Sequence, residues 1–408
     1  MRASIMFSFI ILGGFYNRNR NAYNSLAGSA LLLLLFDPFL IYNVGFQLSY
    51  SAVFGLFFIY PKLKQMITIR NSISNKIWEL MCISIAAQLS TSPLAIYYFH
   101  QFPNYFILTN LFVIPLAFSI VILGMLVLAI SFFSLSTNFI SQLLMLSLNI
   151  LNKGVLQVSL LPYAVSDNLS LKRLELPMFY LILFSTIMLL LYKKRKWIFP
   201  LFTSVLIYLI FTISQYNSEL KNNNWIVYNA KNWSVMDFIS QRKSVLYGDS
   251  LFINSPDLQR YIIDENHIMN RIIQTTIIKN NYTKESAILE DLAFQGNLIL
   301  FQSLRILYLD NEFRNNHYDK KLAIDFVVVS HNANIDLKTL KENYFFKMII
   351  LDSSNDWNTT NKLMQEAKKQ GIDCWNVNEK GASNHGEEEE GTARRDCCLL
   401  PHFWRRRW

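Results

Sequence analysis

The chain has 408 residues, of which 52% are hydrophobic and only 16% are charged. A soluble globular chain carries about 25% charged residues, so this composition excludes a protein that is water-soluble throughout. The charge is also unevenly placed: residues 1–217 hold 14 Lys and Arg against 4 Asp and Glu, whereas residues 218–408 hold 24 against 25. An apolar, basic first half and a charged, balanced second half indicate two regions in different solvents.

Apolar runs fill the first half. A spanning helix needs about 20 mostly apolar residues, and the pattern predicts about seven to eight such helices in a membrane region of residues 1–217. The predicted runs are 3–16, 26–42, 44–60, 77–99, 105–132, 138–161, 176–192 and 197–214. Because proline lacks a backbone N–H, Asp37-Pro38 should break the chain near one membrane face. Pro93 should break the fourth run, and Pro115 should kink the fifth or split it into a re-entrant pair.

Basic residues set the expected orientation. They gather in short loops at 18–20, 62–76 and 193–196, so membrane topology explains the basic excess better than nucleic-acid affinity does. Two predicted crossings separate the first and second clusters, and four separate the second and third. All three clusters can therefore face the cytoplasm, as the positive-inside rule requires. The last span then places residues 218 onward outside the cytoplasm.

Several polar residues interrupt the apolar runs: Gln47, Ser49, Gln88, Ser90, Thr91, Ser92 and Asn110. They are consistent with hydrogen bonds between helices or with a polar path through the bundle, and the residues alone favour the first interpretation. Among Asp, Glu and Arg, only Asp37 lies near the middle of a run. The lack of other intramembrane carboxylates argues against a proton-coupled transporter, and so against a small-solute permease.

Five short motifs follow one another between residues 2 and 115. They read RASIM at 2–6, DPFL at 37–40 with VGFQLSYSAV at 44–53, AQLSTSP at 87–93, YFHQF at 98–102 and NLFVIP at 110–115. In this order they resemble the RAxxM, DP…GFQLSFxAV, AQLxTxP, YFHQF and NLxxIP motifs of the ComEC competence family. Full members of that family carry an N-terminal soluble domain and earlier membrane helices, so we expect this chain to begin near the middle of the competence region.

The resemblance implies a channel of the bacterial inner membrane that takes single-stranded DNA into the cytoplasm during natural transformation. The channel motif candidates are Gly45, Phe46, Gln47, Leu48, Ser49, Gln88, Pro93, Asn110 and Pro115. The expected partners are single-stranded DNA, the lipid bilayer, other competence-machinery proteins and a second copy in a homo-oligomer. We expect Gln47 and Gln88 to serve DNA passage rather than folding. The aromatic residues between Tyr97 and Tyr105 favour an interfacial belt over a base-stacking platform.

Residues 218–381 alternate short β-like runs with polar stretches. The pattern predicts strands at 226–228, 298–301, 324–329 and 347–351 and a helix at 361–370. The fold expected for the whole chain is a polytopic α-helical membrane bundle followed by an extracytoplasmic soluble α/β domain. Many members of the family end in a metallo-β-lactamase-like domain, and the soluble domain resembles a degenerate form of it.

The metal site of such domains reads HxHxDH after a strand. The predicted strand 324–329 is followed by His331, but Asn332 to Asp336 do not continue the motif. A dinuclear centre needs several converging His and carboxylate ligands. We therefore expect no metal, no cofactor and no catalytic residue, and interpret His331 as a structural remnant. The alternative is a membrane-anchored metallo-hydrolase or nuclease, which the sequence would favour only if it contained the metal ligands.

Residues 382–408 differ from the rest of the chain in composition. They contain five Arg and no Lys in 27 residues, a run of four Glu from Glu387 and the pair Cys397-Cys398. This shift in residue usage predicts an aberrant, disordered tail, produced by a shifted reading frame or by an error in the sequence. The alternative is a basic, Trp-capped tail that binds acidic lipid.

Overall fold

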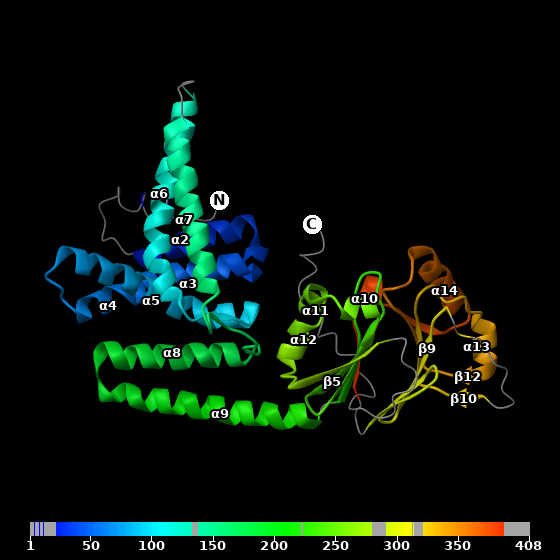
Figure 1. Ribbon diagram of the computed structural model, residues 1–408. Coiled ribbons are helices and arrows are strands. Elements are labelled where there is room, and N and C mark those ends of the chain that lie inside the picture. The colour runs from blue at the N-terminus through cyan, green and yellow to red at the C-terminus, as the bar shows by residue number, and fades with distance from the viewer. Residues whose placement is uncertain are drawn as a thin grey trace. The chain divides into compact units, whose positions relative to one another are not determined.

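The computed structural model describes residues 22–132, 138–221, 223–279, 291–311 and 321–386, together with the single residues Ser4, Ser8, Ile11 and Phe313. They belong to two compact units that divide between Ile210 and Phe211. The first unit is helical, and the second contains helices and sheets (Figure 1). The predicted span 3–16 lies almost wholly outside the described residues.

The first unit is a bundle of apolar helices. Its helices are α2 (Ala22–Phe36), η1 (Pro38–Tyr42), α3 (Val44–Phe58), α4 (Tyr60–Met66), α5 (Ser72–Phe99), α6 (Phe106–Phe132), α7 (Asn138–Ser159), α8 (Glu175–Tyr192), η2 (Arg195–Trp197) and the first half of α9 (Ile198–Lys221), which continues into the second unit. Two short strands, β1 (Phe102–Pro103) and β2 (Val165–Ser166), pair between its loops. Six helical stretches of the described chain, from Val44–Met66 to Arg195–Lys221, are long and apolar enough to cross a membrane, which confirms the polytopic prediction.

The predicted break at Asp37-Pro38 is present. Helix α2 ends at Phe36, and the Asp37 side chain accepts a hydrogen bond from the backbone N–H of Phe39 at 3.0 Å. Pro38 then starts the 3-10 helix. The first residues of a helix have no intrahelical partner for their N–H groups, so a proline loses no hydrogen bond there. The prediction of one span over 26–42 is therefore wrong: its 15-residue helix α2 is shorter than a spanning helix needs to be.

The predicted break at Pro93 and the predicted split at Pro115 are wrong, whereas a kink at Pro115 stays a prediction. Both prolines lie inside continuous helices, Pro93 in α5 and Pro115 in α6. A proline removes the hydrogen bond to the carbonyl four residues earlier, which for Pro93 is that of Leu89. The Ser92 hydroxyl donates to this carbonyl at 3.4 Å and so replaces part of the lost bond. In an apolar surrounding, such side-chain donors let a helix continue through proline.

Small residues bring α3 and α5 close together. A Cβ built on Gly55 would lie only 2.5 Å from Cβ of Ser90 and 2.6 Å from the Ala86 carbonyl. At the same contact, the Ser51 hydroxyl donates to the Ser90 carbonyl and the Ser90 hydroxyl donates to the Ser51 carbonyl, both at 2.6 Å. Tyr180 of α8 adds a second side-chain donor to the Ser90 carbonyl at 3.0 Å. Close backbone approach with polar cross-links is typical of helix packing in membranes.

Two of the three basic clusters lie at one end of this bundle. Lys62 of α4 donates from Nζ to the Tyr192 hydroxyl at 3.0 Å, and Tyr192 directly precedes the basic residues 193–196. Helices α5 to α8 lie between the two clusters in the chain. An even number of crossings returns the chain to the same end, as expected from the sequence. The side of the membrane that this end faces stays a prediction.

The second unit contains two main sheets. The five-stranded sheet has the order β15 (Ser383–Gly386), β3 (Asn223–Val227), β4 (Val235–Ser240), β5 (Lys243–Gly248) and β6 (Gln274–Lys279). The six-stranded sheet has the order β14 (Asp373–Asn376), β13 (Met348–Leu351), β11 (Phe326–Val329), β9 (Leu304–Leu309), β8 (Leu298–Phe301) and β7 (Leu292–Gln295). Strands β9, β11, β13 and β14 are parallel, whereas β7, β8 and β9 pair antiparallel. A separate pair, β10 (Leu322–Ala323) and β12 (Tyr344–Phe345), is parallel.

Helices cover the outer faces of both sheets. They are α10 (Ser250–Ile253), α11 (Pro256–Ile262), α12 (Asp264–Met269), α13 (Leu337–Asn343) and α14 (Trp357–Lys369), whereas Val377 of the short helix α15 (Val377–Lys380) belongs to the core between the sheets. Phe252 of α10 packs with outward-facing residues of the five-stranded sheet, and Leu340 of α13 and Leu363 of α14 pack on the six-stranded sheet. The soluble unit is therefore α/β, as predicted, and the four predicted strands and the helix overlap β3, β8, β11, β13 and α14.

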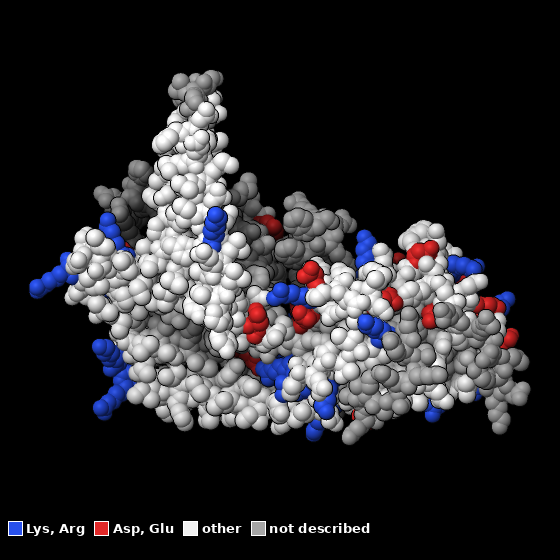
Figure 2. Space-filling view, viewed as in Figure 1, with Lys and Arg blue, Asp and Glu red and all other residues white. Residues whose placement is uncertain are grey.

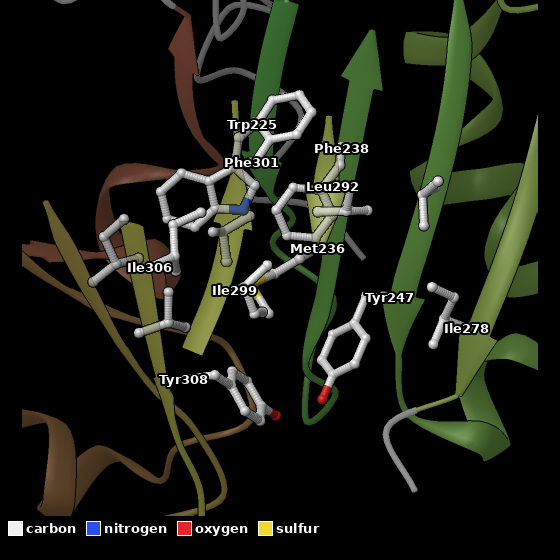
Figure 3. Packing of buried hydrophobic residues seen from close by; sticks show 14 of the residues in the cluster. Trp225, Met236, Phe238, Tyr247, Ile278, Leu292, Ile299, Phe301, Ile306 and Tyr308 are labelled. Atoms are coloured by element: carbon white, nitrogen blue, oxygen red, sulfur yellow. The ribbon is translucent and has the colours of Figure 1, made fainter. Parts of the chain in front are cut away.

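The inner faces of the two sheets form one hydrophobic core. Trp225, Met236 and Phe238 of the five-stranded sheet pack with residues such as Phe301 and Ile306 of the six-stranded sheet (Figure 3). Side chains alternate along each strand, so residues two apart share a face. Met236 and Phe238 therefore point into this core, whereas their neighbours point toward the covering helices.

The soluble unit extends past the predicted boundary at 381. Strand β15 pairs antiparallel with β3, and the His385 ring stacks on Trp225 with ring centroids 5.5 Å apart. Burial lowers the pKa of His385 to about 4, so the ring is neutral in this core. The prediction that the aberrant tail begins at Ala382 is wrong for residues 382–386. The rest of that prediction, from 387 onward, falls outside the described residues.

Candidate functional sites

The first candidate site lies where the helix break meets α5. Gln47, in the first turn of α3, donates from Nε2 to the Ile41 carbonyl at 2.7 Å, and its Oε1 accepts from the Tyr98 hydroxyl at 2.9 Å. One amide therefore ties the 3-10 helix η1 to both α3 and α5. Since an amide in an apolar region is costly unless its polar atoms are paired, this geometry gives Gln47 a positioning role.

The other residues of the same motif shape the start of α3. The Asn43 side chain accepts hydrogen bonds from the backbone N–H groups of Gly45 at 3.0 Å and Phe46 at 3.3 Å. The Ser49 hydroxyl donates to the Gly45 carbonyl at 2.6 Å, Phe46 is buried and Leu48 is half-buried. The residues from Asn43 to Ser49 therefore cap and stabilise the first turn of α3 directly after η1 ends.

The remaining motif candidates lie on α5 and α6. Gln88 and Asn110 are half-buried, and neither side chain forms a hydrogen bond with another residue in the described part of the chain. Pro93 is buried and Pro115 is exposed. The structure therefore brings Gln47 and Tyr98 into contact but pairs neither Gln88 nor Asn110 with them.

The second candidate site lies at strand ends in the soluble unit. Asp249 follows β5, His331 follows β11 and Asp352 follows β13. Nε2 of His331 lies 3.1 Å from Oδ2 of Asp249, so this ion pair links the ends of the two sheets. The carboxyl ends of parallel strands are where open α/β sheets bind ligands.

A network of turns holds His331 in place. Its backbone N–H donates to the Ser354 hydroxyl at 2.7 Å, and that hydroxyl donates to Oδ1 of Asp352 at 2.6 Å. His331 and Asn332 both have positive φ angles, 51° and 57°, a region that residues other than glycine seldom occupy. Such backbone conformations cost energy and persist only where surrounding contacts hold them.

Two groups of this site have shifted pKa values. Burial raises the pKa of Asp352 to about 6. The hydrogen bond with Asp249 raises the pKa of His331, and the negative charges of Asp249, Asp352 and Asp310 act in the same direction, whereas burial opposes them. The site therefore favours the charged form of the His331 imidazole.

The amino-acid sequence matches two family profiles. The profile described as Competence protein matches residues 1–196, and the profile described as ComEC C-terminal domain matches residues 225–385. The chain belongs to the ComEC-type competence protein family. Both candidate sites of this competence protein lie within the matched regions.

A curated relative is also similar to part of this ComEC-type chain. It is the ComE operon protein 3 of Bacillus subtilis (strain 168), with 28% identity over 139 residues. The alignment covers 34% of this chain and 17% of that protein, so the chain spans well under two thirds of the relative's length. No solved structure matches the chain.

Two histidines of the soluble unit in this ComEC-type protein pair with carboxylates. Within the described ranges, no group of three or more His, Cys, Asp or Glu side chains is arranged to hold a metal ion. Nε2 of His267 lies 2.7 Å from Oδ2 of the buried Asp237. His331 is likewise paired with Asp249 rather than isolated. Sequence reasoning missed both carboxylates because they lie far from their histidines in the chain, and the only available indication was that Asp249 follows a strand.

Proposed function

We propose that this chain forms part of an inner-membrane channel that takes up single-stranded DNA during natural transformation. Membership of the competence family supports a role in DNA uptake, and six apolar helices support a multi-pass membrane protein. The observation that carries the channel proposal is the Gln47 contact with Ile41 and Tyr98. Irregular backbone at membrane depth is tolerated only where it packs on protein or lines a water-filled cavity.

The charges of the membrane unit suit an anionic strand. Its basic residues outnumber its acidic residues, and the clusters around Lys62 and 193–196 share one end of the bundle. We assign that end to the cytoplasm, which leaves the soluble unit outside, and the proposed partners are the DNA strand, the bilayer, other competence proteins and a second copy. A reporter that is active only in the cytoplasm should be inactive when fused after residue 220. Activity there would contradict this orientation.

The Gln47–Tyr98 contact can be tested by removing one hydroxyl. Tyr98→Phe keeps the ring and deletes the donor to Gln47, so we expect transformation frequency to fall while the amount of full-length protein in the membrane stays normal. Gln47→Leu should have a larger effect, because it also releases the Ile41 carbonyl. Gln65→Leu, the same substitution at an exposed position of α4, is the matched control. Normal transformation in both Tyr98→Phe and Gln47→Leu would contradict the proposal.

The second hypothesis is a membrane-anchored metal hydrolase. The residues after His331 read Asn332-Ala333-Asn334 and lack the further histidines of HxHxDH, so we propose that the soluble unit does not act as a metal nuclease. Metal analysis of the purified full-length protein separates the two hypotheses. Stoichiometric zinc or manganese, with DNA cleavage abolished by His331→Ala, would establish the hydrolase.

A further inference from the structure

Helix α7 carries a stripe of polar side chains. The stripe consists of Asn138, Gln142, Asn149, Asn152 and Lys153. At about 100° per residue, their spacing confines all five to an arc of about 100° on one face of the helix. The same arc also holds the exposed apolar residues Met145 and Leu156. The stripe is about 22 Å long at 1.5 Å per residue, which is most of the roughly 30 Å hydrocarbon thickness of a bilayer.

The opposite face of α7 packs against α6. A Cβ built on Gly154 would lie 2.9 Å from the Phe112 ring, which fixes that face toward α6. Ile140, Leu144 and Leu151 are half-buried on the same side as Gly154. The contact with α6 therefore turns the polar stripe away from its partner helix.

Nothing in the described part of the bundle covers the stripe. All five side chains are exposed, and none forms a hydrogen bond or ion pair with another described residue. Figure 2 shows the α6–α7 hairpin almost free of charged groups, and Lys153 is the one charged residue in the sequence of these two helices. Facing hydrocarbon, each unpaired polar group would cost several kcal/mol, so the stripe needs water or polar partners.

We propose that this stripe lines the water-filled path along which the DNA strand crosses the membrane, an inference that rests on the proposed function. The chemistry of the stripe complements a single strand. Four amides donate and accept hydrogen bonds without charge, Lys153 attracts phosphate, and no carboxylate repels it. A second membrane helix packed on the stripe is the competing occupant, and it would exclude water.

Water accessibility distinguishes the two occupants. In the full-length protein with its native cysteines replaced, Asn149→Cys should react with a charged methanethiosulfonate in sealed membrane vesicles. Leu148→Cys lies at the same depth but about 100° away on the helix, and is the matched control. Because only the thiolate reacts and an apolar surrounding raises the pKa of a thiol, the stripe position should react at least about tenfold faster. Equal, slow reaction at both positions would overturn the proposal.

DNA uptake supplies the second measurement. Labelling at Asn149→Cys should block transformation, and labelling of the Leu148→Cys control should not. Lys153→Gln should lower transformation frequency while Lys153→Arg retains it, with both proteins at normal levels in the membrane. A reactive Asn149→Cys whose labelling leaves uptake unchanged would overturn the DNA path. The proposed function fails separately, if Tyr98→Phe and Gln47→Leu both leave transformation normal.

Discussion

The close approach of α3 and α5 at Gly55 can be tested with one methyl group. In Gly55→Ala, the new Cβ would lie 2.5 Å from Cβ of Ser90 and 2.6 Å from the Ala86 carbonyl. Carbon atoms in contact lie about 3.5–4.0 Å apart, so the two helices must separate by about 1 Å. That movement would stretch the reciprocal Ser51–Ser90 hydrogen bonds from 2.6 Å beyond the range of a hydrogen bond.

The magnitude follows from three contributions. Overpacking costs about 1–3 kcal/mol, and losing two hydrogen bonds inside a membrane adds about 0.6 kcal/mol each. Alanine gains up to about 1 kcal/mol over glycine in helix propensity. We expect Gly55→Ala to destabilise the membrane unit by about 1–3 kcal/mol. Gly124→Ala, which meets no atom within 4 Å, should be neutral or stabilising by up to about 1 kcal/mol.

Cys82 provides the assay. Its side chain is fully buried on α5, so its thiol should react with a dye only when the bundle opens. In detergent-solubilised full-length protein with the other cysteines replaced, the SDS fraction at half-maximal labelling measures stability. The midpoint should fall for Gly55→Ala and hold or rise for Gly124→Ala. Equal midpoints in the two variants would refute the close packing of α3 on α5.

The remaining predictions concern the soluble unit. The His331–Asp249 pair should stabilise it more at about pH 5.5 than at about pH 8, measured in urea as the difference between the unchanged protein and the His331→Gln, Asp249→Asn double variant. The buried, neutral His385 opposes this direction by favouring higher pH, and its contribution cancels in that difference. The raised pKa of His331 means that its pair with Asp249 stabilises the fold fully below the ordinary value of 6.5, and this contribution is lost as the pH rises through the folded pKa. Asp352 acts in the same direction, because its pKa of about 6 lies above the ordinary 3.8 and its buried charged form is disfavoured. Unchanged pH dependence in the His331→Gln, Asp249→Asn double variant would contradict the ion pair. Trp225→Ala should lower the free energy of unfolding of the soluble unit by about 3–5 kcal/mol, because the Trp225 side chain fills the core. Limited proteolysis of the full-length protein measures this loss. Trp357 is exposed, so Trp357→Ala should change the stability by less than about 0.5 kcal/mol. Equal protection of the two variants from proteolysis would refute the packing of Trp225 in the core.

The sequence by itself determined the membrane region, the family and most helix positions. Long apolar runs can only be stable in hydrocarbon as helices, so hydropathy alone located α5, α6, α7, α8 and α9. The break at Asp37-Pro38 was also predictable, because proline lacks a donor and the Asp37 side chain caps the next segment. The effect of Pro93 was not predictable, since it depends on whether a neighbouring side chain such as Ser92 replaces the lost hydrogen bond.

Only the tertiary structure decided which polar groups meet. Gln47 and Tyr98 are 51 positions apart in the chain, and His331 and Asp249 are 82 apart. No local spacing links such pairs, because contacts between elements depend on how helices pack and how strands are ordered in a sheet. The same reason explains strand β15: its composition suggested a foreign tail, yet its backbone hydrogen bonds with β3 and the stacking of His385 on Trp225 place it in the sheet. Backbone pairing is available to almost any residue type, so composition could not reveal it.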